Sequence, residues 1–460
     1  MGSLTASLNI SLQSMLAEQG AIETTSNNIA NVNTPGYSRQ RADLEESPPV
    51  TIGNVTLGTG VKLEDVTSLR DAILDLRVNQ ETQQQGKLNA FLSGGQQIQT
   101  LFNETAGAGL QAPITAFFNS LTQLSSTPSD LTARQNVLTS AQNLAQAFNQ
   151  ASSGLSSLQQ NTNLGVQQSV SQINSLTAQI AQVNEQVSAA TGAGVNAGPF
   201  IDQRQQLINQ LSNYVDVSEI DAGHGSLTLT TNTGAALVAG GESFALSTQA
   251  DATTDALHVY SNGSDITTKI AGGQLAGQIQ VRDQEIPSVQ NSLDTLAYNL
   301  ANAVNTQNGQ GYDLNGLPGG NIFAAPTQVQ GASATLSVSM TDPSKIAASG
   351  GPAPGAAGDN TNVNAMANLQ NQSLANGQTP LSDYTTLVFK VGNDVASAQT
   401  EQQSGNQVLQ QLQNLQGGVS GVDINEEAAN LIRFQNAYQA SAQVSSVINT
   451  LLQDTINMVR

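Results

Sequence analysis

Few side chains in the sequence are of the kinds that carry out catalysis, and none has the spacing of a catalytic or metal-binding motif. The two histidines, His224 and His258, fall in a glycine-rich turn and in an expected strand, outside the HExxH pattern of helix-borne metal ligands. The chain contains no cysteine, which excludes disulfides, thiolate nucleophiles and sulfur-ligated metals. Since no paired carboxylate lies near either histidine in the sequence, we expect neither to bind a metal or act as a base.

Four further segments resemble ligand sites or catalytic acids only in part. The glycine-rich segment 192–198 follows a predicted helix and lacks the GK[ST] ending of a phosphate-binding loop, which favours an interhelical loop. Asp313 begins a DLNG turn without the remaining ligands of a calcium loop. The acidic pairs 45–46 and 426–427 lie at a joint and at a helix start, where solvation and capping explain them. We therefore expect a protein that is not an enzyme and binds no cofactor.

Composition narrows the class of protein further. At 460 residues the chain has room for two to four domains, yet only 10% of its residues are charged and 4% aromatic. A net charge of −20 repels nucleic acid and anionic lipid. No apolar run reaches the roughly 18 residues of a membrane span. The first basic residue is Arg39, so we expect no cleaved secretory signal, and composition alone favours a cytoplasmic protein.

The last forty residues form the most strongly patterned stretch of the chain. They predict one helix with an apolar seam, and Asp423 and Glu426 have the spacing of a capping box at its start. The seam residues are Ile424, Leu431, Phe434, Tyr438, Ile448, Leu452 and Val459. Val444, Leu451 and Met458 each precede a seam position by one residue. Because they widen the stripe beyond one narrow contact, we expect more than one neighbouring helix.

The first thirty-four residues carry a matching pattern. A predicted helix with apolar residues spaced by seven, Leu8, Met15, Ile22 and Ile29, must end before Pro35. The turn that follows contains Asn31, Asn33, Thr34, Pro35, Gly36 and Tyr37. We expect the asparagines to satisfy carbonyl groups at the helix end, Gly36 to adopt a positive φ, and Tyr37 to offer its ring to a neighbour.

Neither terminal helix is expected to be stable alone. Burial of a stripe residue contributes roughly 1.5–3 kcal/mol, whereas ordering each backbone residue costs about 1–2 kcal/mol. A heptad stripe by itself usually indicates packing inside one bundle. Combined with the turn at 31–37, it favours ends that become ordered only against each other and against further subunits.

Between the ends, the pattern is mostly helical with one β-rich stretch. Residues 68–215 predict helices, the clearest being the heptad stripe Val166, Ile173, Ile180 and Val187. From 217 to 270 the period changes to two, which predicts strands and hairpins. Further helices are expected from 274 to 316 and from 363 to 415, with a strand at 332–340 and a glycine hinge at 417–421.

These patterns predict a mainly α fold with a small β insertion, in which long terminal helices pair as a coiled coil beside an elongated helical bundle. The predicted domains are a terminal assembly domain of residues 1–65 and 421–460, including a joint with short strands at 38–65; a central bundle of 66–216 and 274–420; and a β-rich insertion of 217–273, with a minor strand or loop at 322–360.

Two terminal segments carry a resemblance to a known family. SNNIANVNTPGYSRQ at 26–40 and the segment 425–459 resemble the N- and C-terminal signatures of the flagellar rod, hook and hook-associated proteins. The sequence at 37–40, Tyr-Ser-Arg-Gln, is similar to the hook-associated version, as are the segments near 68–77 and 272–316. The similarity covers nearly the whole chain and is weakest at 217–270.

The resemblance implies a structural subunit of the bacterial flagellum that self-assembles helically to join hook and filament. It implies terminal helices that form an inner tube, with the assembly interface comprising the seam residues, the turn at 31–37 and Arg39. Implied partners are further copies, the hook protein, the next junction protein, an export chaperone and the type III export apparatus. The implied location is extracellular, reached without a cleaved signal.

Two alternatives stay open at this stage. A hook or distal rod protein shares the terminal signatures but has a largely β middle, whereas 68–215 here predicts helices. An exported hydrolase with filament-like ends needs a catalytic constellation, which the sequence does not supply. Flagellin lacks the Asn-Thr-Pro-Gly-Tyr signature found at 33–37.

Overall fold

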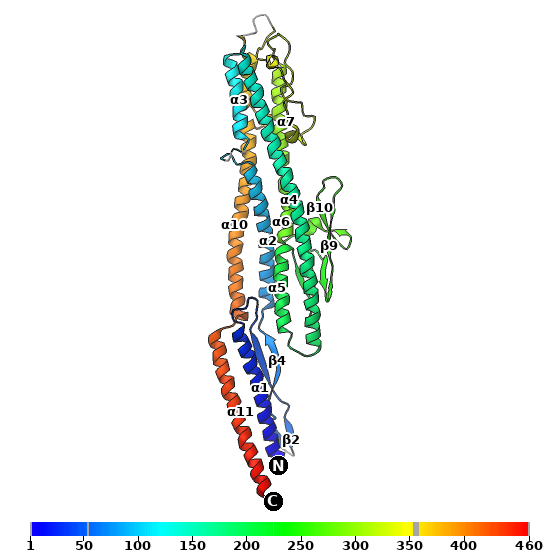
Figure 1. Cartoon of the computed structure of the whole chain (residues 1–460), viewed down its shortest axis with the longest axis vertical. Helices are drawn as coiled ribbons and strands as arrows, with labels where there is room; N and C mark the ends of the chain where they lie inside the picture. The colour runs from blue at the N-terminus through cyan, green and yellow to red at the C-terminus, as the bar shows by residue number, and fades with distance from the viewer. Residues whose placement is uncertain are drawn as a thin grey trace.

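The computed structural model is a long rod in which both chain termini lie at one end (Figure 1). It describes residues 2–52, 55–105, 107, 109–223, 225–352 and 358–458. At the terminal end, α1 (Gly2–Ala30) and α11 (Ile424–Met458) run side by side, and most of the remaining rod is helical. The predicted mainly α fold, with paired long terminal helices, a central bundle and a small β part, is confirmed.

The bundle is built around one very long helix. α4 (Leu131–Gly192) has 62 residues, which corresponds to about 90 Å at the rise of an α-helix. The Asp130 carboxylate caps it by accepting the Thr132 N–H at 2.8 Å. The other α-helices of the bundle are α2 (Ala72–Leu101), α3 (Gln111–Ser126), α5 (Gly198–Tyr214), α6 (Gly273–Gln280), α7 (Ile286–Gly309), α9 (Thr361–Asn368) and α10 (Pro380–Ser420). A π-helical turn, η2 (Val281–Glu285), connects α6 to α7. Short 3-10 turns are η1 (Thr267–Lys269), η3 (Pro343–Lys345) and η5 (Leu369–Asn371).

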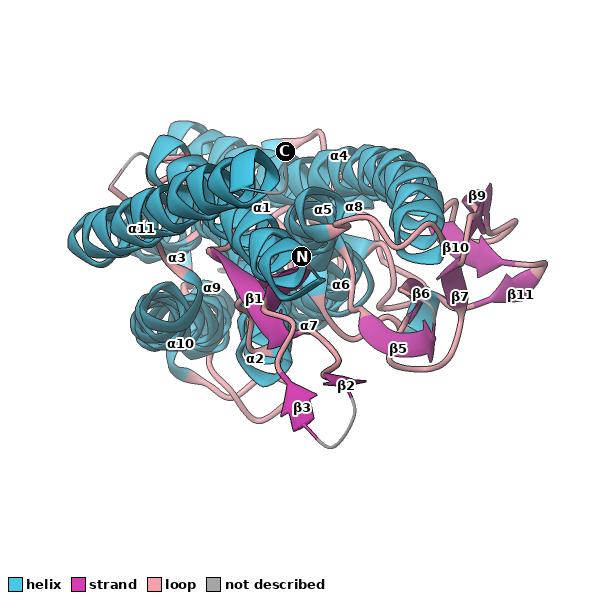
Figure 2. Ribbon diagram, turned by 90° about the horizontal axis from the view of Figure 1, so that it is seen from below, coloured by secondary structure: helices cyan, strands magenta, loops and turns pink. Residues whose placement is uncertain are grey.

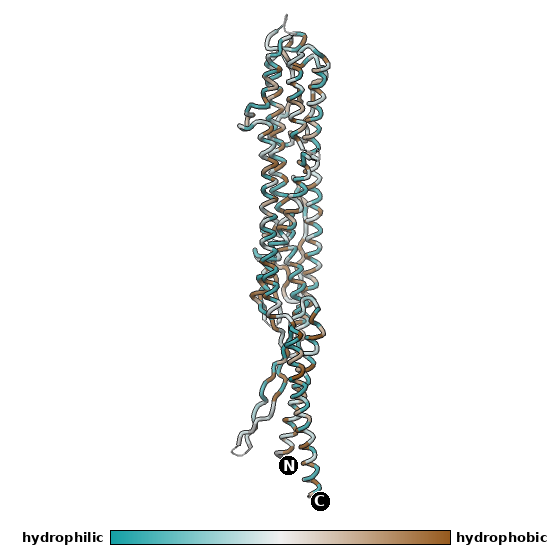
Figure 3. The backbone as a smooth tube through the Cα atoms, turned by 90° about the vertical axis from the view of Figure 1, so that its left-hand side faces the viewer, coloured by the Kyte–Doolittle hydropathy of each residue, from teal (hydrophilic) through white to brown (hydrophobic). Residues whose placement is uncertain are grey.

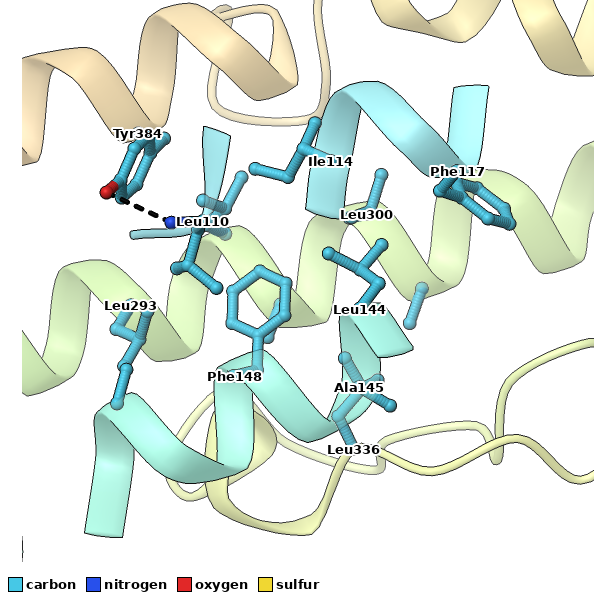
Figure 4. Packing of buried hydrophobic residues seen from close by; sticks show 14 of the residues in the cluster. Leu110, Ile114, Phe117, Leu144, Ala145, Phe148, Leu293, Leu300, Leu336 and Tyr384 are labelled. Atoms are coloured by element: carbon cyan, nitrogen blue, oxygen red, sulfur yellow. Dashed lines mark hydrogen bonds between the residues drawn. The ribbon is translucent and has the colours of Figure 1, made fainter. Parts of the chain in front are cut away.

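Two hydrophobic clusters follow one another along the rod, and α4 contributes to both. The first half of α4 packs with α3, α7 and α10, where Phe148, Leu144 and Leu300 are buried together (Figure 4). The second half packs with α5, α6 and the β-rich segment. The predicted heptad residues from Val166 to Val187 are all fully buried in this second cluster, which confirms that stripe as a bundle helix.

The β-rich segment forms two small antiparallel sheets on one side of the rod (Figure 2), as predicted for residues 217–270. The strands are β5 (Ser218–Gly223), β6 (Ser226–Thr230), β7 (Ala236–Ala239) and β8 (Glu242–Ser243) in one sheet and β9 (Leu246–Ala250), β10 (Leu257–Ser261) and β11 (Ser264–Asp265) in the other. Two asparagines of α4 hold them. The Asn174 amide donates to the Leu246 carbonyl and accepts its N–H, and Asn184 donates to the Leu227 carbonyl.

Short strands lie where the terminal helices meet the bundle. β1 (Gln40–Glu46) pairs antiparallel with β4 (Val61–Ser68), and β2 (Val50–Ile52) pairs with β3 (Val55–Leu57) to form a hairpin that projects from the rod (Figure 2). β1 and β4 both contact α1. The division into domains at residues 65, 216, 273 and 420 stays a prediction.

Two local predictions are wrong. The strand expected at 332–340 is a short helix, α8 (Ala332–Thr335), followed by a loop, because the buried Asp294 carboxylate accepts the N–H groups of Gly331 and Ser333 and closes a helical turn. The glycines at 417–418 continue α10 instead of forming a hinge. The chain changes direction only at Gly421, which is extended and whose N–H closes the helix end on the Gly417 carbonyl.

Hydrophilic and hydrophobic residues are interspersed along the rod, as expected for amphipathic helices that share narrow cores (Figure 3). Among the described residues, no helix combines the length and the apolarity that crossing a bilayer requires.

Truncating the buried stripe of α4 should destabilise the rod. Ile173→Ala is expected to lower the free energy of unfolding by about 2–5 kcal/mol, because it leaves a cavity in a packed core. Leu164→Ala in the same helix, where the side chain is 57% exposed, should change it by less than about 0.5 kcal/mol. Urea unfolding of both variants followed by circular dichroism measures the difference; equal losses would contradict the assignment.

Candidate assembly interface

The turn after α1 ends the helix as the sequence predicts. The Asn31 side-chain amide donates to the Asn27 carbonyl at 3.0 Å, and Gly36 has φ +77°. A Cβ on Gly36 would lie 2.1 Å from the amide nitrogen of Gln206, whose side chain donates to the Pro35 carbonyl at 2.5 Å. The exposed turn residues are Asn33, Thr34, Pro35 and Gly36. Pro35 and Gly36 therefore contact Gln206 of α5 directly.

Tyr37 points into the protein. Its hydroxyl donates to the side-chain oxygen of Asn28 at 2.8 Å, and the residue is half-buried. Burial, together with the negative charges of Asp202 and Glu427, raises the pKa of Tyr37 to about 12. The polar tip expected to face a neighbour is thus used within the chain.

A buried carboxylate lies at the centre of this region. Glu427 in α11 is 2% exposed, and its two oxygens accept from Arg39 Nε at 2.7 Å and from the Asn28 amide at 3.0 Å. The same guanidinium binds Glu426 through two nitrogens at 2.5 and 3.0 Å, which raises the Arg39 pKa. Burying an unpaired carboxylate is costly, so α11 can start here only with Arg39 in place.

The predicted capping box of α11 has two parts, a cap by Asp423 and a return contact by Glu426, and only the first is observed. Asp423 does cap the helix, accepting the Asn425 N–H at 2.8 Å. Glu426 and Glu427, however, bind Arg39, so solvation and capping do not account for them.

Asn28 connects these interactions, although we did not predict it as a site residue. Its amide donates to the Gln40 carbonyl at 2.7 Å and to Glu427, while its oxygen accepts the Gln40 N–H at 2.9 Å and the Tyr37 hydroxyl. All of its hydrogen-bonding capacity is therefore satisfied. Asn28 lies within the segment 26–40 that resembles the family signature, and this position could have identified it. Its burial against Glu427 of α11 could not be read from the sequence.

Further hydrogen bonds attach this cluster to the bundle. The Ser38 N–H donates to the Asp202 carboxylate of α5 at 2.9 Å, and burial raises the Asp202 pKa. The Arg39 N–H donates to the Ser420 carbonyl at the end of α10 at 2.8 Å. We call the set Asn28, Tyr37, Arg39, Asp202, Glu426 and Glu427 the joint cluster. It fixes α1 and α11 relative to the rod.

Below the joint cluster, α1 and α11 meet along a seam of mostly small residues. Ala17 and Ala21 are fully buried, and Ser14 and Ser441 hydrogen-bond across the seam at 3.0 Å. Ser445 and Ile448 of α11 are buried as well. The predicted seam residues that are partly buried are Leu8, Met15, Ile22, Ile29, Leu431, Phe434 and Leu452. Small side chains allow the two backbones to approach closely.

Other predicted seam residues are not covered. Ile424 is 53% exposed and Tyr438 is 37% exposed. Val459 lies outside the described residues. Three apolar residues at a spacing of seven, Val444, Leu451 and Met458, are 51%, 47% and 79% exposed. We call these three residues the α11 flank.

The remaining candidate residues from the sequence are the two histidines, Asp313 and the glycine-rich segment 192–198. His258 Nδ1 lies 2.6 Å from Asp265, so a carboxylate does accompany it, contrary to the prediction. Hydrogen bonds from His258 and Thr267 outweigh partial burial and lower the Asp265 pKa to about 2. Asp313 closes a turn, and the segment 192–198 joins α4 to α5, as predicted. His224 lies outside the described residues. In the described part of the chain no group of three or more His, Cys, Asp or Glu side chains could hold a metal.

Comparisons with known proteins match the same elements. Residues 95–323 match the helical domain of flagellar hook-associated protein FlgK, residues 8–37 the flagella basal body rod protein family, and residues 416–458 the C-terminal region of flagellar basal body rod FlgEFG proteins. The fold is similar to the solved structure of the flagellar hook junction protein FlgK from Burkholderia pseudomallei, with a TM-score of 0.66 at 19% identity, covering 75% of this chain and 100% of that one.

Full-length relatives agree with these matches. The chain is 28% identical to flagellar hook-associated protein 1 of Bacillus subtilis, over 99% of both chains. It is 27% identical to flagellar hook-associated protein 1 of Escherichia coli, over 99% of this chain and 100% of the relative. With its helical middle and both terminal regions matched, the chain belongs to the flagellar hook-associated protein 1 family.

Proposed function

We propose that the chain is a non-enzymatic structural subunit of the junction between hook and filament, and that copies assemble helically through their terminal helices. The exposed α11 flank is the observation that carries this proposal. Each flank residue leaves apolar surface in water, and a neighbouring helix can cover it. A helical array needs head-to-tail contacts between two different faces, and a pair of helices with an uncovered flank offers one of them.

The joint cluster supports the same function. Because Arg39 and Asp202 hold the terminal pair at one angle to the bundle, every copy presents its flank in the same direction. The expected partners are further copies on the same tier, the hook protein on one side and the next junction protein on the other. A chaperone and the type III export apparatus would deliver the chain to the cell exterior without cleavage of a signal. The net charge of −20 disfavours nucleic-acid partners.

The alternatives have less support. The middle of a hook or distal rod protein is largely β, whereas α2 to α5 fill residues 72–214 here with little interruption. An exported hydrolase needs a catalytic constellation, whereas His258, the one histidine among the described residues, pairs with Asp265 on a surface sheet.

A deletion in cells tests the proposed function directly. A strain whose chain lacks residues 426–460 is expected to build hooks but no filaments, because the flank is lost together with Glu426 and Glu427 of the joint cluster. Electron microscopy of the cell surface gives the result. Normal filaments in this strain would overturn the proposal, provided that the truncated chain is detected outside the cell.

The isolated monomer should have loosely held ends. Within described α11 only Glu427, Ser445 and Ile448 are buried, whereas α4 buries residues along its whole length. We therefore expect fast amide hydrogen exchange in α1 and α11 and slow exchange in residues 131–192. Exchange followed by mass spectrometry measures both in one sample; equally slow exchange at the ends would show that they need no partner.

Charge on the α11 flank should block assembly without unfolding the monomer. Leu451→Asp is expected to abolish filament growth, because an unpaired carboxylate would enter an apolar contact. Its effect on the melting of the monomer should be small, since the side chain is already half-exposed. Gln453→Asp adds the same charge at an exposed position on the other side of α11 and should leave swimming intact. Equal swimming by both strains would remove the flank from the interface.

Removing Arg39 should release the start of α11. Arg39→Gln leaves Glu427 buried without its cation, at a cost of about 3 kcal/mol to the local stability. Amide exchange in the first turns of α11, which the joint cluster holds, is expected to be faster than in the parent chain, and exchange in α4 is expected to be unchanged. The double variant Arg39→Gln/Glu427→Gln should recover part of the protection, because a neutral amide is cheaper to bury. Loss of protection that is equal in both variants would show that charge pairing is not the cause.

A further inference from the structure

The lower half of α10 is covered on one side only. From Gln402 to Ser420, a stretch described throughout, no side chain is fully buried. α2 lies alongside it (Figure 1) and is held by polar contacts, with Gln402 donating to Asn89 and Gln416 to Asp75, both at 2.5 Å. The upper half, by contrast, buries Tyr384, Leu387, Val391, Val395 and Ala398. Half of a 41-residue helix therefore lies at the surface of the rod.

An apolar stripe runs along this exposed half. Val408, Leu412, Leu415 and Val419 follow one another at spacings of four, three and four residues. At about 100° per residue they lie within an arc of about 60° on the helix. Val408, Leu415 and Val419 are 45%, 52% and 43% exposed, and Leu412 is partly buried. We call these four residues the α10 stripe. Its spacing is that of the core positions of a coiled coil, which pack against another helix.

The electrostatics of the stripe favour a partner of the same kind. The sequence has no charged residue from Gln402 to Val422, although the chain as a whole carries a charge of −20. Two copies that approach through most other surfaces bring acidic groups together, whereas the stripe itself carries none, and the neighbouring Asp75 of α2 already accepts a hydrogen bond from Gln416. A basic partner finds no carboxylate within the stripe to pair with. The face is therefore suited to contact with a second copy of a strongly acidic chain.

The described part of the chain leaves the stripe largely exposed. After Gly421, α11 leads away from α10 and packs along α1 (Figure 1), and the joint cluster holds it there. Among the described elements, α2 is the main neighbour of α10.

We infer that the α10 stripe is a second assembly interface, in which Val408, Leu412, Leu415 and Val419 pack against a helix of a neighbouring copy. The inference rests on the proposed function, because that function places copies side by side, and adds a contact in the rod to the contact at the termini. Since open arrays use head-to-tail contacts, the helix that covers the stripe belongs to a different face of the neighbour.

Site-directed photo-crosslinking tests the contact. The chain has no cysteine, so a single Leu415→Cys can be labelled with a benzophenone maleimide in isolated hook–filament assemblies. Gln410→Cys is the matched control, because it is exposed and lies about 170° around the same helix from the centre of the stripe. We expect irradiation of the Leu415 label to give an adduct of two copies of this chain, and the Gln410 label to give little or none.

The identity of the adduct decides the outcome. Mass spectrometry that finds two copies of this chain joined through Leu415 supports the inference. An adduct with the hook protein or another flagellar chain, an adduct within one copy, or equal yields from both positions would overturn it. The labelled monomers are compared by thermal unfolding, and both should melt like the parent, because neither side chain is buried.

A substitution gives a second, independent measurement. Leu415→Ala is expected to weaken incorporation of the chain into assemblies about tenfold, which corresponds to roughly 1.4 kcal/mol, whereas Gln410→Ala should have no effect. Undiminished incorporation of Leu415→Ala would overturn the inference. If cells without the whole chain still grow filaments, the proposed function fails; if filaments need the chain but Leu415 captures no second copy, only the stripe contact fails.

Discussion

The placement of the terminal helices depends on one buried carboxylate. Glu427 enters the protein at the first turn of α11 and is compensated by a guanidinium from the turn after α1 and an amide from α1 itself. Because the three groups come from different elements, neither helix can take its position without the other. The same turn is hydrogen-bonded to α5 and α10. The contacts that hold α1 and α11 together therefore also attach them to the rod.

The apolar surface of the terminal pair is distributed in an unusual way. Its seam contains alanine, serine and asparagine, and several of its larger apolar residues, among them Leu451 and Met458, lie outside. A helix pair that was complete by itself would bury its large residues and expose its small ones. The observed pattern suits close approach of α1 and α11 with apolar surface left for additional neighbours. The α10 stripe likewise leaves apolar surface exposed on the rod, where a neighbouring copy can cover it.

Much of this architecture followed from periodicity. The heptads of the terminal helices and of Val166–Val187, the change to period two after 217, and the helix stop at Pro35 all correspond to elements of the structure. The errors arose where a tertiary contact decided the local conformation, as when Asp294 captured two backbone amides and turned an expected strand into α8. The glycines at 417–418 were misread for a different reason: they remain helical, with no atom of another element within 4 Å of the position of a Cβ. The joint cluster could not be assembled from the sequence, since Asn28 and Glu427 lie 399 positions apart and each looks like an ordinary polar helix residue.

The uninterrupted length of α4 has a mechanical consequence. A single helix that passes through both hydrophobic clusters leaves no soft section between them, so the rod responds to bending or twisting as one stiff lever. The joint cluster ties this lever to the terminal pair, because the turn after α1 is hydrogen-bonded to both α5 and α10. A subunit built in this way passes a twist applied to its body on to the terminal pair.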